Sequence, residues 1–192
     1  MKHILLASNS PRRKWLLEDA GYILTLVKST YEEPNEDEGN AYQMVMEQSL
    51  GKAKEAILTE EEKELIEQGK AALLTADTIV ILDGKILGKP VDEEDAKAML
   101  RLLSGRTHEV ATGVTLHTKE EWDTFYVVTT ICFQELSEEQ IEKYVVECQP
   151  LDKCGAYGLH ELDESWIKEV DGSSSNVIGL PMEAVTERLA ML

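Results

Sequence analysis

The chain has 192 residues, 43% of them apolar and 29% charged, so it is long and apolar enough to fold as a soluble globular domain. Its 19 basic and 37 acidic residues give a net charge of -18, which argues against a protein that coats nucleic acid. No apolar run approaches the roughly 18 residues of a membrane span, and the first apolar run is too short for a signal peptide, so we expect no membrane partner.

The N-terminal segment predicts a strand, a capped helix and a second strand. The apolar run at 3–6 is typical of a short buried strand. Ser10 is a predicted N-cap and Pro11 the first helical residue, where proline is best tolerated. Gly21 marks the helix end, and residues 22–27 predict the next strand.

Two arginines stand where this helix least favours cations. Arg12 and Arg13 fall in its first turn, at the positive end of the helix dipole. A strand that enters a helix through a serine-rich turn binds anions well, and Ser8 and Ser10 add hydroxyl donors. Phosphate binding is one interpretation, and surface arginines covering an apolar patch are the alternative.

An acidic loop over 28–39 precedes an amphipathic helix predicted over 40–58. In the loop, Glu32 and Glu33 are candidate metal ligands or ordinary solvated acids. In the helix, Lys52 lies at the edge of the apolar stripe, so its ammonium group can reach the surface against which the helix packs. Residues 59–70 predict a solvated helix.

Asp77 interrupts the most apolar strand, predicted over 72–82. A carboxylate there must be paired, hydrogen-bonded or bound to metal. It is therefore a candidate general base or Mg²⁺ ligand, and a structural aspartate is the alternative. The turn at Asp83 and Gly84 sends the chain back, so Lys89 is either close to Asp77 or simply solvated.

The rest of the chain mixes helices and strands without strict alternation, which predicts a mixed α/β fold around one long sheet. We expect helices at 92–105, 137–148 and from 182, strands at 107–118, 122–136 and 165–170, and a turn at 171–176. The glycine-flanked loop at 152–161 either presents Tyr157 or His160 to a flat ligand, or is a tight turn with a core tyrosine.

The cysteines and histidines indicate neither a zinc site nor a disulfide framework. Cys132, Cys148 and Cys154 have unrelated spacings, and the four histidines form no ligand motif. We expect reduced cysteines and a cytoplasmic protein. A basic helix start, a buried acid and two further lysines on an acidic chain instead favour binding and hydrolysis of a polyphosphate with a divalent metal.

Five ordered motifs together resemble the Maf family of nucleoside triphosphate pyrophosphatases. They are LLASNSPRRKWLL, TADTIVILDGKILGKP, LSGRTHEVATGV, DKCGAYG and GSSSNVIGLP. The resemblance covers nearly the whole chain as a single domain, 1–192. It implies a fold like that of the inosine triphosphatases, with a long bent mixed sheet, flanking helices and two lobes around a central cleft. It also implies cleavage between the α- and β-phosphates, in housekeeping of the nucleotide pool.

The resemblance assigns a role to each matching residue. Asp77 matches the proton acceptor, Lys52 and Lys89 match catalytic lysines, and Glu33 with Asp77 matches the metal ligands, with Mg²⁺ expected and Mn²⁺ the alternative. The matching substrate-binding residues are Ser8, Ser10, Arg12, Arg13, Thr78 and His160.

The loop around His160 departs from the dTTP/UTP-type subgroup. That subgroup reads Ala-Tyr-Gly-Ile-Gln-Gly, whereas this chain reads AYGLHE, so His160 replaces an amide that matches a pyrimidine edge. The expected substrates remain dTTP, UTP or modified pyrimidine nucleotides, and the resemblance suggests a homodimer. The alternatives are a nucleotide-binding regulator of cell division with little hydrolysis, and a phosphatase that releases orthophosphate.

Overall fold

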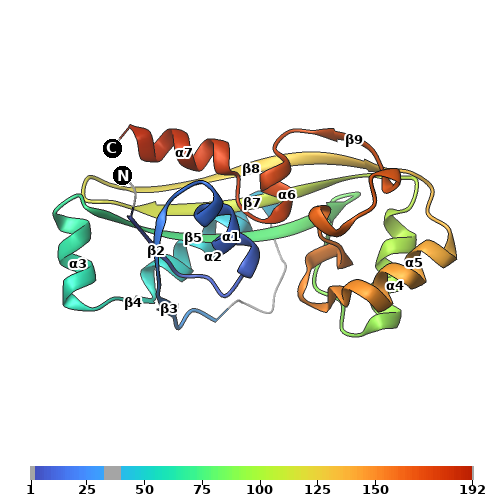
Figure 1. The fold of residues 1–192 in the computed structure, drawn as a ribbon, viewed down its shortest axis with the longest axis horizontal. Coiled ribbons are helices and arrows are strands. Elements are labelled where there is room, and N and C mark those ends of the chain that lie inside the picture. The colour runs from blue at the N-terminus through green and yellow to red at the C-terminus, as the bar shows by residue number, and fades with distance from the viewer. Residues whose placement is uncertain (1–2, 33–39, 192) are drawn as a thin grey trace. The chain divides into compact units, whose positions relative to one another are not determined.

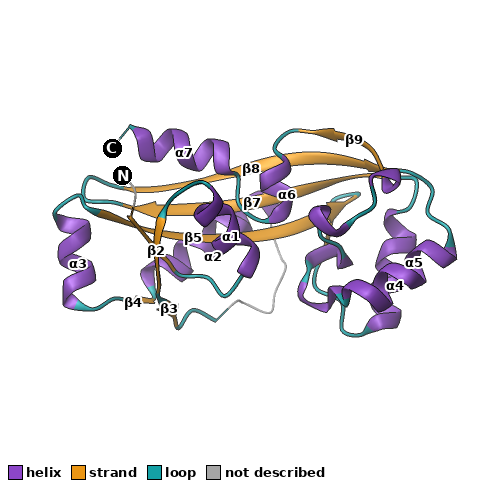
Figure 2. Ribbon diagram, viewed as in Figure 1, coloured by secondary structure: helices purple, strands orange, loops and turns teal. Residues whose placement is uncertain are grey.

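The computed structural model describes residues 3–32 and 40–191, and Figures 1 and 2 show its helices and strands. The chain divides into two compact units. The first contains residues 1–77, 112–127 and 179–192, and the second contains residues 78–111 and 128–178. Within the described ranges, no helix is long and apolar enough to cross a membrane.

Most of the described strands form one mixed sheet in the order β2-β1-β5-β7-β8-β9, with β6 paired to β5. The strands are β1 His3–Leu6, β2 Ile23–Leu26, β5 Ala71–Leu82, β6 Lys85–Leu87, β7 Thr107–His117, β8 Trp122–Phe133 and β9 Ile167–Asp171. Strand β1 is parallel to both β2 and β5. Strand β6 is antiparallel to β5, and β9 is antiparallel to β8. The predicted mixed α/β fold around a long sheet is confirmed; the cleft between two lobes stays a prediction.

Three of the four described helices of the first unit begin at a side-chain cap. The four are α1 Pro11–Asp19, α2 Ala41–Lys54, α3 Glu60–Glu67 and α7 Met182–Ala190, and the capped ones are α1, α2 and α3. The Asn40 side chain accepts hydrogen bonds from two backbone N–H groups at the start of α2, and Thr59 forms a capping box with Glu62 at the start of α3. Helix α7 packs along β8, where Arg188 bonds Asp123 at 2.9 Å.

Helix α2 ends earlier than the sequence predicts. The apolar periodicity continues to residue 58, but the helix ends at Lys54 and strand β4, Ala56–Ile57, follows. The reason is a competing backbone pairing, because β4 pairs antiparallel with β3, Lys28–Ser29. This pairing satisfies backbone groups that another helical turn would have satisfied.

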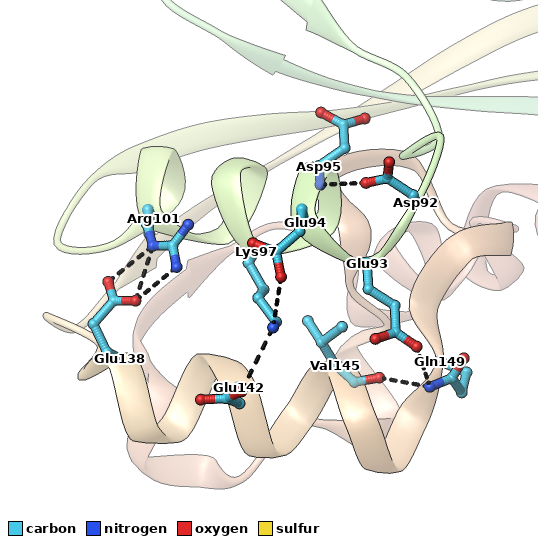
Figure 3. Close-up of polar contacts among 10 residues, drawn as sticks. All are labelled: Asp92, Glu93, Glu94, Asp95, Lys97, Arg101, Glu138, Glu142, Val145 and Gln149. Atoms are coloured by element: carbon cyan, nitrogen blue, oxygen red, sulfur yellow. Dashed lines mark hydrogen bonds and ion pairs between the residues drawn. The ribbon is translucent and has the colours of Figure 1, made fainter.

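The second unit contains a pair of packed helices, α4 Glu93–Leu103 and α5 Glu138–Cys148. Figure 3 shows the polar contacts along their seam. Arg101 bonds both carboxylate oxygens of Glu138 at 2.8–2.9 Å, and Lys97 lies 2.9 Å from Glu94 and 3.6 Å from Glu142. Leu100, Ile141 and Val145 are among the buried residues of the core cluster that α4 and α5 share.

The segment after β9 is more helical than predicted. The expected turn at 171–176 contains the start of α6, Ser174–Ile178. The Ser173 hydroxyl accepts a hydrogen bond from the backbone N–H of Asn176 at 3.1 Å, and the buried Asn176 amide donates to the Val110 carbonyl and the Thr129 hydroxyl at 3.0 Å. Local capping and a buried amide therefore order a serine-rich stretch that reads as a turn.

Candidate active site

The start of α1 has the geometry that its sequence predicts. Ser10 has extended backbone angles and its hydroxyl accepts from the backbone N–H of Arg13 at 3.5 Å, while Pro11 is the first helical residue. The backbone N–H of Ser10 donates to the Ser8 hydroxyl at 3.2 Å. The serines thus fix the turn that leads into the helix, where the first N–H groups favour an anion.

Arg13 is held by acceptors of the protein itself. Its Nε donates to the carbonyl of Gly179 at 2.8 Å, and its Nη1 donates to the Ser8 hydroxyl at 3.2 Å. Both Arg12 and Arg13 are half-buried. The Arg13 guanidinium therefore has a defined position beside the serine turn.

Asp77 on β5 and Lys52 on α2 form a close ion pair within the first unit. The Lys52 Nζ lies 2.6 Å from Asp77 Oδ1, and the two side chains are 17% and 12% exposed. Burying a carboxylate in an apolar strand is costly without a counter-charge, and the ammonium group supplies it. Among residues 3–32 and 40–191 no other side chain donates to Asp77, so its second oxygen can accept a proton or a ligand.

Helix α2 holds Lys52 in place through close packing on the sheet. The Thr75 hydroxyl donates to the Ser49 carbonyl at 2.6 Å, and the Ser49 hydroxyl lies 3.0 Å from that of Thr115. A side chain at Gly113 would overlap the carbonyl of Val45, so only glycine permits this approach of α2 to β7. The sequence gives no local signal of these contacts, because they join residues far apart in the chain.

Lys89 and Thr78 belong to the second unit. The β5–β6 hairpin has its turn at Asp83 and Gly84, both with positive φ, as predicted. Lys89 follows β6 and is exposed, and Thr78 is half-buried. In the part of the chain that the structure describes, Lys89 makes no ion pair, and its place beside Asp77 stays a prediction.

The loop between α5 and β9 consists largely of 3-10 turns and contains His160. The turns are Pro150–Asp152, Cys154–Ala156, Leu159–Glu161 and Glu164–Trp166. The side chain of His160 is 36% exposed, and its Nε2 lies 3.7 Å from Glu161 Oε1. Tyr157 is 5% exposed and its hydroxyl lies 2.7 Å from Nε2 of His108. Tyr157 is therefore a core residue, and the interpretation in which it contacts a ligand is wrong.

Glu161 is tied to two buried groups, which the sequence alone did not reveal. Its carboxylate lies 3.3 Å from the ammonium of Lys153, a side chain that is 7% exposed. It also accepts a hydrogen bond from the Tyr144 hydroxyl at 3.1 Å, and that hydroxyl accepts from the backbone N–H of Gly158 at 3.0 Å. The residue after His160 thus anchors the loop that presents it.

The metal assignment rests on Asp77 alone, because Glu33 lies outside the described residues. Within 3–32 and 40–191, no group of three or more His, Cys, Asp or Glu side chains could hold a metal ion. Mg²⁺ that accompanies phosphates keeps several waters and needs only one or two carboxylates. The uncommitted oxygen of Asp77 fits that requirement.

Comparison with known proteins extends over almost all of the chain. A family model described as "Maf-like protein" matches residues 3–192. A protein of Bacillus cytotoxicus named dTTP/UTP pyrophosphatase is 43% identical over 189 residues, which cover 98% of this chain and 95% of that relative. Proteins of the same name from Bacillus cereus and Bacillus thuringiensis are 42% and 41% identical, again over 98% of this chain and 95% of theirs.

Proposed function

The chain belongs to the Maf-like protein family, and we propose from that premise that it hydrolyses nucleoside triphosphates between the α- and β-phosphates. The products are a nucleoside monophosphate and pyrophosphate, and the role is housekeeping of the nucleotide pool. The name dTTP/UTP pyrophosphatase, carried by relatives about 42% identical over nearly the full length, supports this activity and its pyrimidine substrates.

The observation that carries the proposal is the buried pair of Lys52 and Asp77, 2.6 Å apart. In the proposed reaction Asp77 orients the attacking water and accepts its proton. Lys52 stabilises the charge that grows on the phosphates, in a site from which much of the water is excluded. An acid with a cation beside it suits this division of roles, because Asp77 acts on the attacking water and Lys52 acts on the phosphates that the water attacks.

The serine turn and the first helix supply the proposed phosphate site. Ser8, Ser10 and the first N–H groups of α1 donate to phosphate oxygens, and Arg12 and Arg13 add forked cationic donors. The bonds from Arg13 to Gly179 and Ser8 support a pre-organised position for its guanidinium. The triphosphate is the proposed anion that offsets the unfavourable position of two arginines at the positive end of the helix dipole.

Lys89 and a divalent metal complete the proposed machinery. Lys89 neutralises charge on the leaving pyrophosphate, and Asp77 with Glu33 holds the metal, with Mg²⁺ preferred to Mn²⁺. When bound, the metal neutralises phosphate charge and polarises the phosphoryl group under attack. We also propose that the protein is cytoplasmic, because Cys132, Cys148 and Cys154 form no disulfide among the described residues, and that it works as a homodimer.

His160 and Thr78, together with Arg12, are the proposed residues of base choice. Neutral histidine offers one donor and one acceptor, as the amide of the dTTP/UTP-type loop does, though on a ring with wider spacing. The Glu161 carboxylate, tied to Lys153 and Tyr144, supports a fixed loop at this point.

The experiment that tests the proposed role of Asp77 compares two matched variants. Asp77→Asn keeps the shape of the side chain and removes the proton acceptor, so we expect turnover of dTTP and UTP to fall by roughly 10²- to 10⁴-fold. Asp171→Asn, on the exposed part of β9, serves as the control and should keep wild-type turnover. Steady-state rates with Mg²⁺, together with circular dichroism of both variants, supply the measurement.

Near-wild-type turnover by folded Asp77→Asn would contradict the mechanism. Tight binding of a triphosphate by the wild-type chain without any turnover would instead favour a nucleotide-binding regulator of cell division.

A further inference from the structure

A cavity of about 450 Å³ lies in the first unit, lined by residues that the proposed reaction does not use. It is bounded by the end of α2, β4, α3, the start of β5 and the turn between β7 and β8. Its volume falls in the range of small-molecule sites. The cavity shares helix α2 with the Lys52 site but contains neither Lys52 nor Asp77.

The floor of this cavity is apolar. Ala53, Ile66 and Leu73 line it and are 3%, 3% and 1% exposed, and all three belong to one buried cluster. Ala56 and Leu58 line it as well and pack against the same cluster. A ligand entering here therefore buries apolar surface against a preformed wall, which favours a hydrophobic group.

One wall is aromatic. The rings of His117 and Trp122 stack with centroids 3.9 Å apart and an angle of 15° between their planes, yet Trp122 remains 45% exposed. The turn that joins their strands is fixed, because the Thr118 backbone N–H donates to the Glu121 carbonyl at 3.0 Å and the Glu121 N–H donates to the Thr118 hydroxyl at 3.3 Å. The position of the indole is thus pre-organised for stacking with a planar ring.

His117 also supplies a polar atom in need of a partner. Its Nδ1 is buried and has no hydrogen-bond partner within residues 3–32 and 40–191. Burial lowers the pKa of this imidazole, so the ring is neutral at pH 7. The neutral imidazole therefore adds an uncharged ring to the wall that Trp122 forms.

The rim of the cavity carries three lysines and one acid. Lys54, Lys63 and Lys119 line it, together with the acid Glu67. Lys63 is paired with Glu60 at 2.6 Å, and Lys119 lies 3.9 Å from Glu120. Lys54 is exposed and has no ion pair in the described part of the chain. Because Lys63 is already paired, Lys54 and Lys119 are the rim cations that could face an anionic group of a ligand.

We propose that this cavity binds a small molecule that joins a planar aromatic ring to one anionic group. The ring stacks on Trp122 above the apolar floor, and a carboxylate or phosphate faces Lys54 and Lys119. The proposal does not depend on the activity assigned above, since none of the residues proposed for hydrolysis lines the cavity.

The test titrates the full-length protein with 2-naphthoate and with 2-naphthyl phosphate while the indole N–H signals are followed by NMR. The signal of Trp122 is identified by its loss in Trp122→Phe, and those of Trp15 and Trp166 serve as internal controls. We expect saturable shifts of the Trp122 signal, and the tighter of the two probes identifies the preferred anion. The neutral analogue 2-naphthylmethanol should bind at least about 5-fold more weakly than the carboxylate.

Charge variants provide the second readout by calorimetry. The double variant Lys54→Gln/Lys119→Gln should weaken 2-naphthoate at least about 5-fold and leave 2-naphthylmethanol unchanged. Lys168→Gln, on exposed β9, should change neither. Absence of a Trp122 shift at millimolar probe, shifts of Trp15 or Trp166 instead, or equal binding by the double variant would overturn the proposal. None of these results bears on pyrophosphate release.

Discussion

His108 is buried beside Tyr157, with its Nε2 2.7 Å from the tyrosine hydroxyl, and packs edge-on against Phe133. Burial lowers the pKa of His108 from 6.5 to about 4. Burial likewise raises the pKa of the Tyr157 hydroxyl. Both groups are therefore neutral at pH 7, and the contact between them is a neutral hydrogen bond inside the core.

This buried histidine predicts a loss of stability in acid. Because its pKa is lower in the folded chain than in the unfolded one, the unfolded chain binds the proton first as pH falls from about 6.5 to about 4. The wild-type chain should lose about 2 kcal/mol of unfolding free energy relative to His108→Gln between pH 7 and pH 5. Urea denaturation of both proteins at the two pH values measures the difference, and a gap between them that does not change with pH would show that the folded-state pKa is not lowered.

Glu161 is the residue whose removal should expose the cost of burying Lys153. Glu161→Ala leaves Asp152, at 2.9 Å, as the remaining acid paired with that lysine among the described residues, and it removes the acceptor of the Tyr144 hydroxyl. We expect a loss of about 1–3 kcal/mol in unfolding free energy. Glu161→Gln should lose less, because its amide oxygen still accepts from Tyr144. The exposed Glu164→Ala is the control, and equal stability of Glu161→Ala and this control would refute the assignment.

Single residues differ in how far the sequence alone could place them. Asp77 was predictable as a paired acid, because burying a carboxylate in an apolar strand without a partner is costly. Its partner was not predictable, since the helical pattern places Lys52 at the edge of the apolar stripe but does not indicate which strand lies against that edge. Tyr157 shows the converse: two flanking glycines suit a ligand loop and a core turn equally well, and only the contact with His108 decides between them.

At the scale of elements, two helices begin with serine caps that differ in their proposed roles. The Ser10 hydroxyl caps α1 at 3.5 Å, and the Ser137 hydroxyl caps α5 at 3.2 Å within a capping box. Only the first cap borders the proposed phosphate site. Comparing substitutions at Ser10 and Ser137 therefore separates the contribution of capping to stability from its contribution to substrate binding.

Substituting each cap in turn tests this separation. Ser10→Ala and Ser137→Ala should each lose about 1 kcal/mol of unfolding free energy. Only Ser10→Ala should raise the KM for the triphosphate, by roughly 5-fold if one hydrogen bond of about 1 kcal/mol is lost. Denaturation curves and steady-state kinetics supply the two measurements. An unchanged KM in Ser10→Ala, or an equal rise in Ser137→Ala, would remove Ser10 from the phosphate site.

Elements were predictable where their signals are local. The cap at Ser10 and the turn at Asp83 and Gly84 lie within a few residues of what they fix, and the structure confirms both. The end of α2 was not predictable, because it depends on pairing between β3 and β4 across the chain. The need for glycine at position 113 was not predictable either, because it depends on the close approach of the Val45 carbonyl, which is distant in the chain.

At the scale of the whole molecule, the balance of charge opposes the proposed substrate. The net charge of -18 repels a triphosphate in general, so its binding depends on local cations, and Arg12, Arg13 and Lys52 are the candidates in the first unit. The mixed sheet was predictable from the order of helical and strand patterns. Its strand order was not predictable, because β5 lies between β1 and β7 in the sheet, and neither of these strands is next to β5 along the chain.

The central claim is that the bond between the α- and β-phosphates is the one cleaved. The most direct measurement incubates the wild-type protein with dTTP or UTP and Mg²⁺ and assays pyrophosphate and orthophosphate separately. The account predicts equal amounts of pyrophosphate and nucleoside monophosphate, with no orthophosphate. Orthophosphate with a nucleoside diphosphate, or a bound triphosphate that is never cleaved, would contradict it.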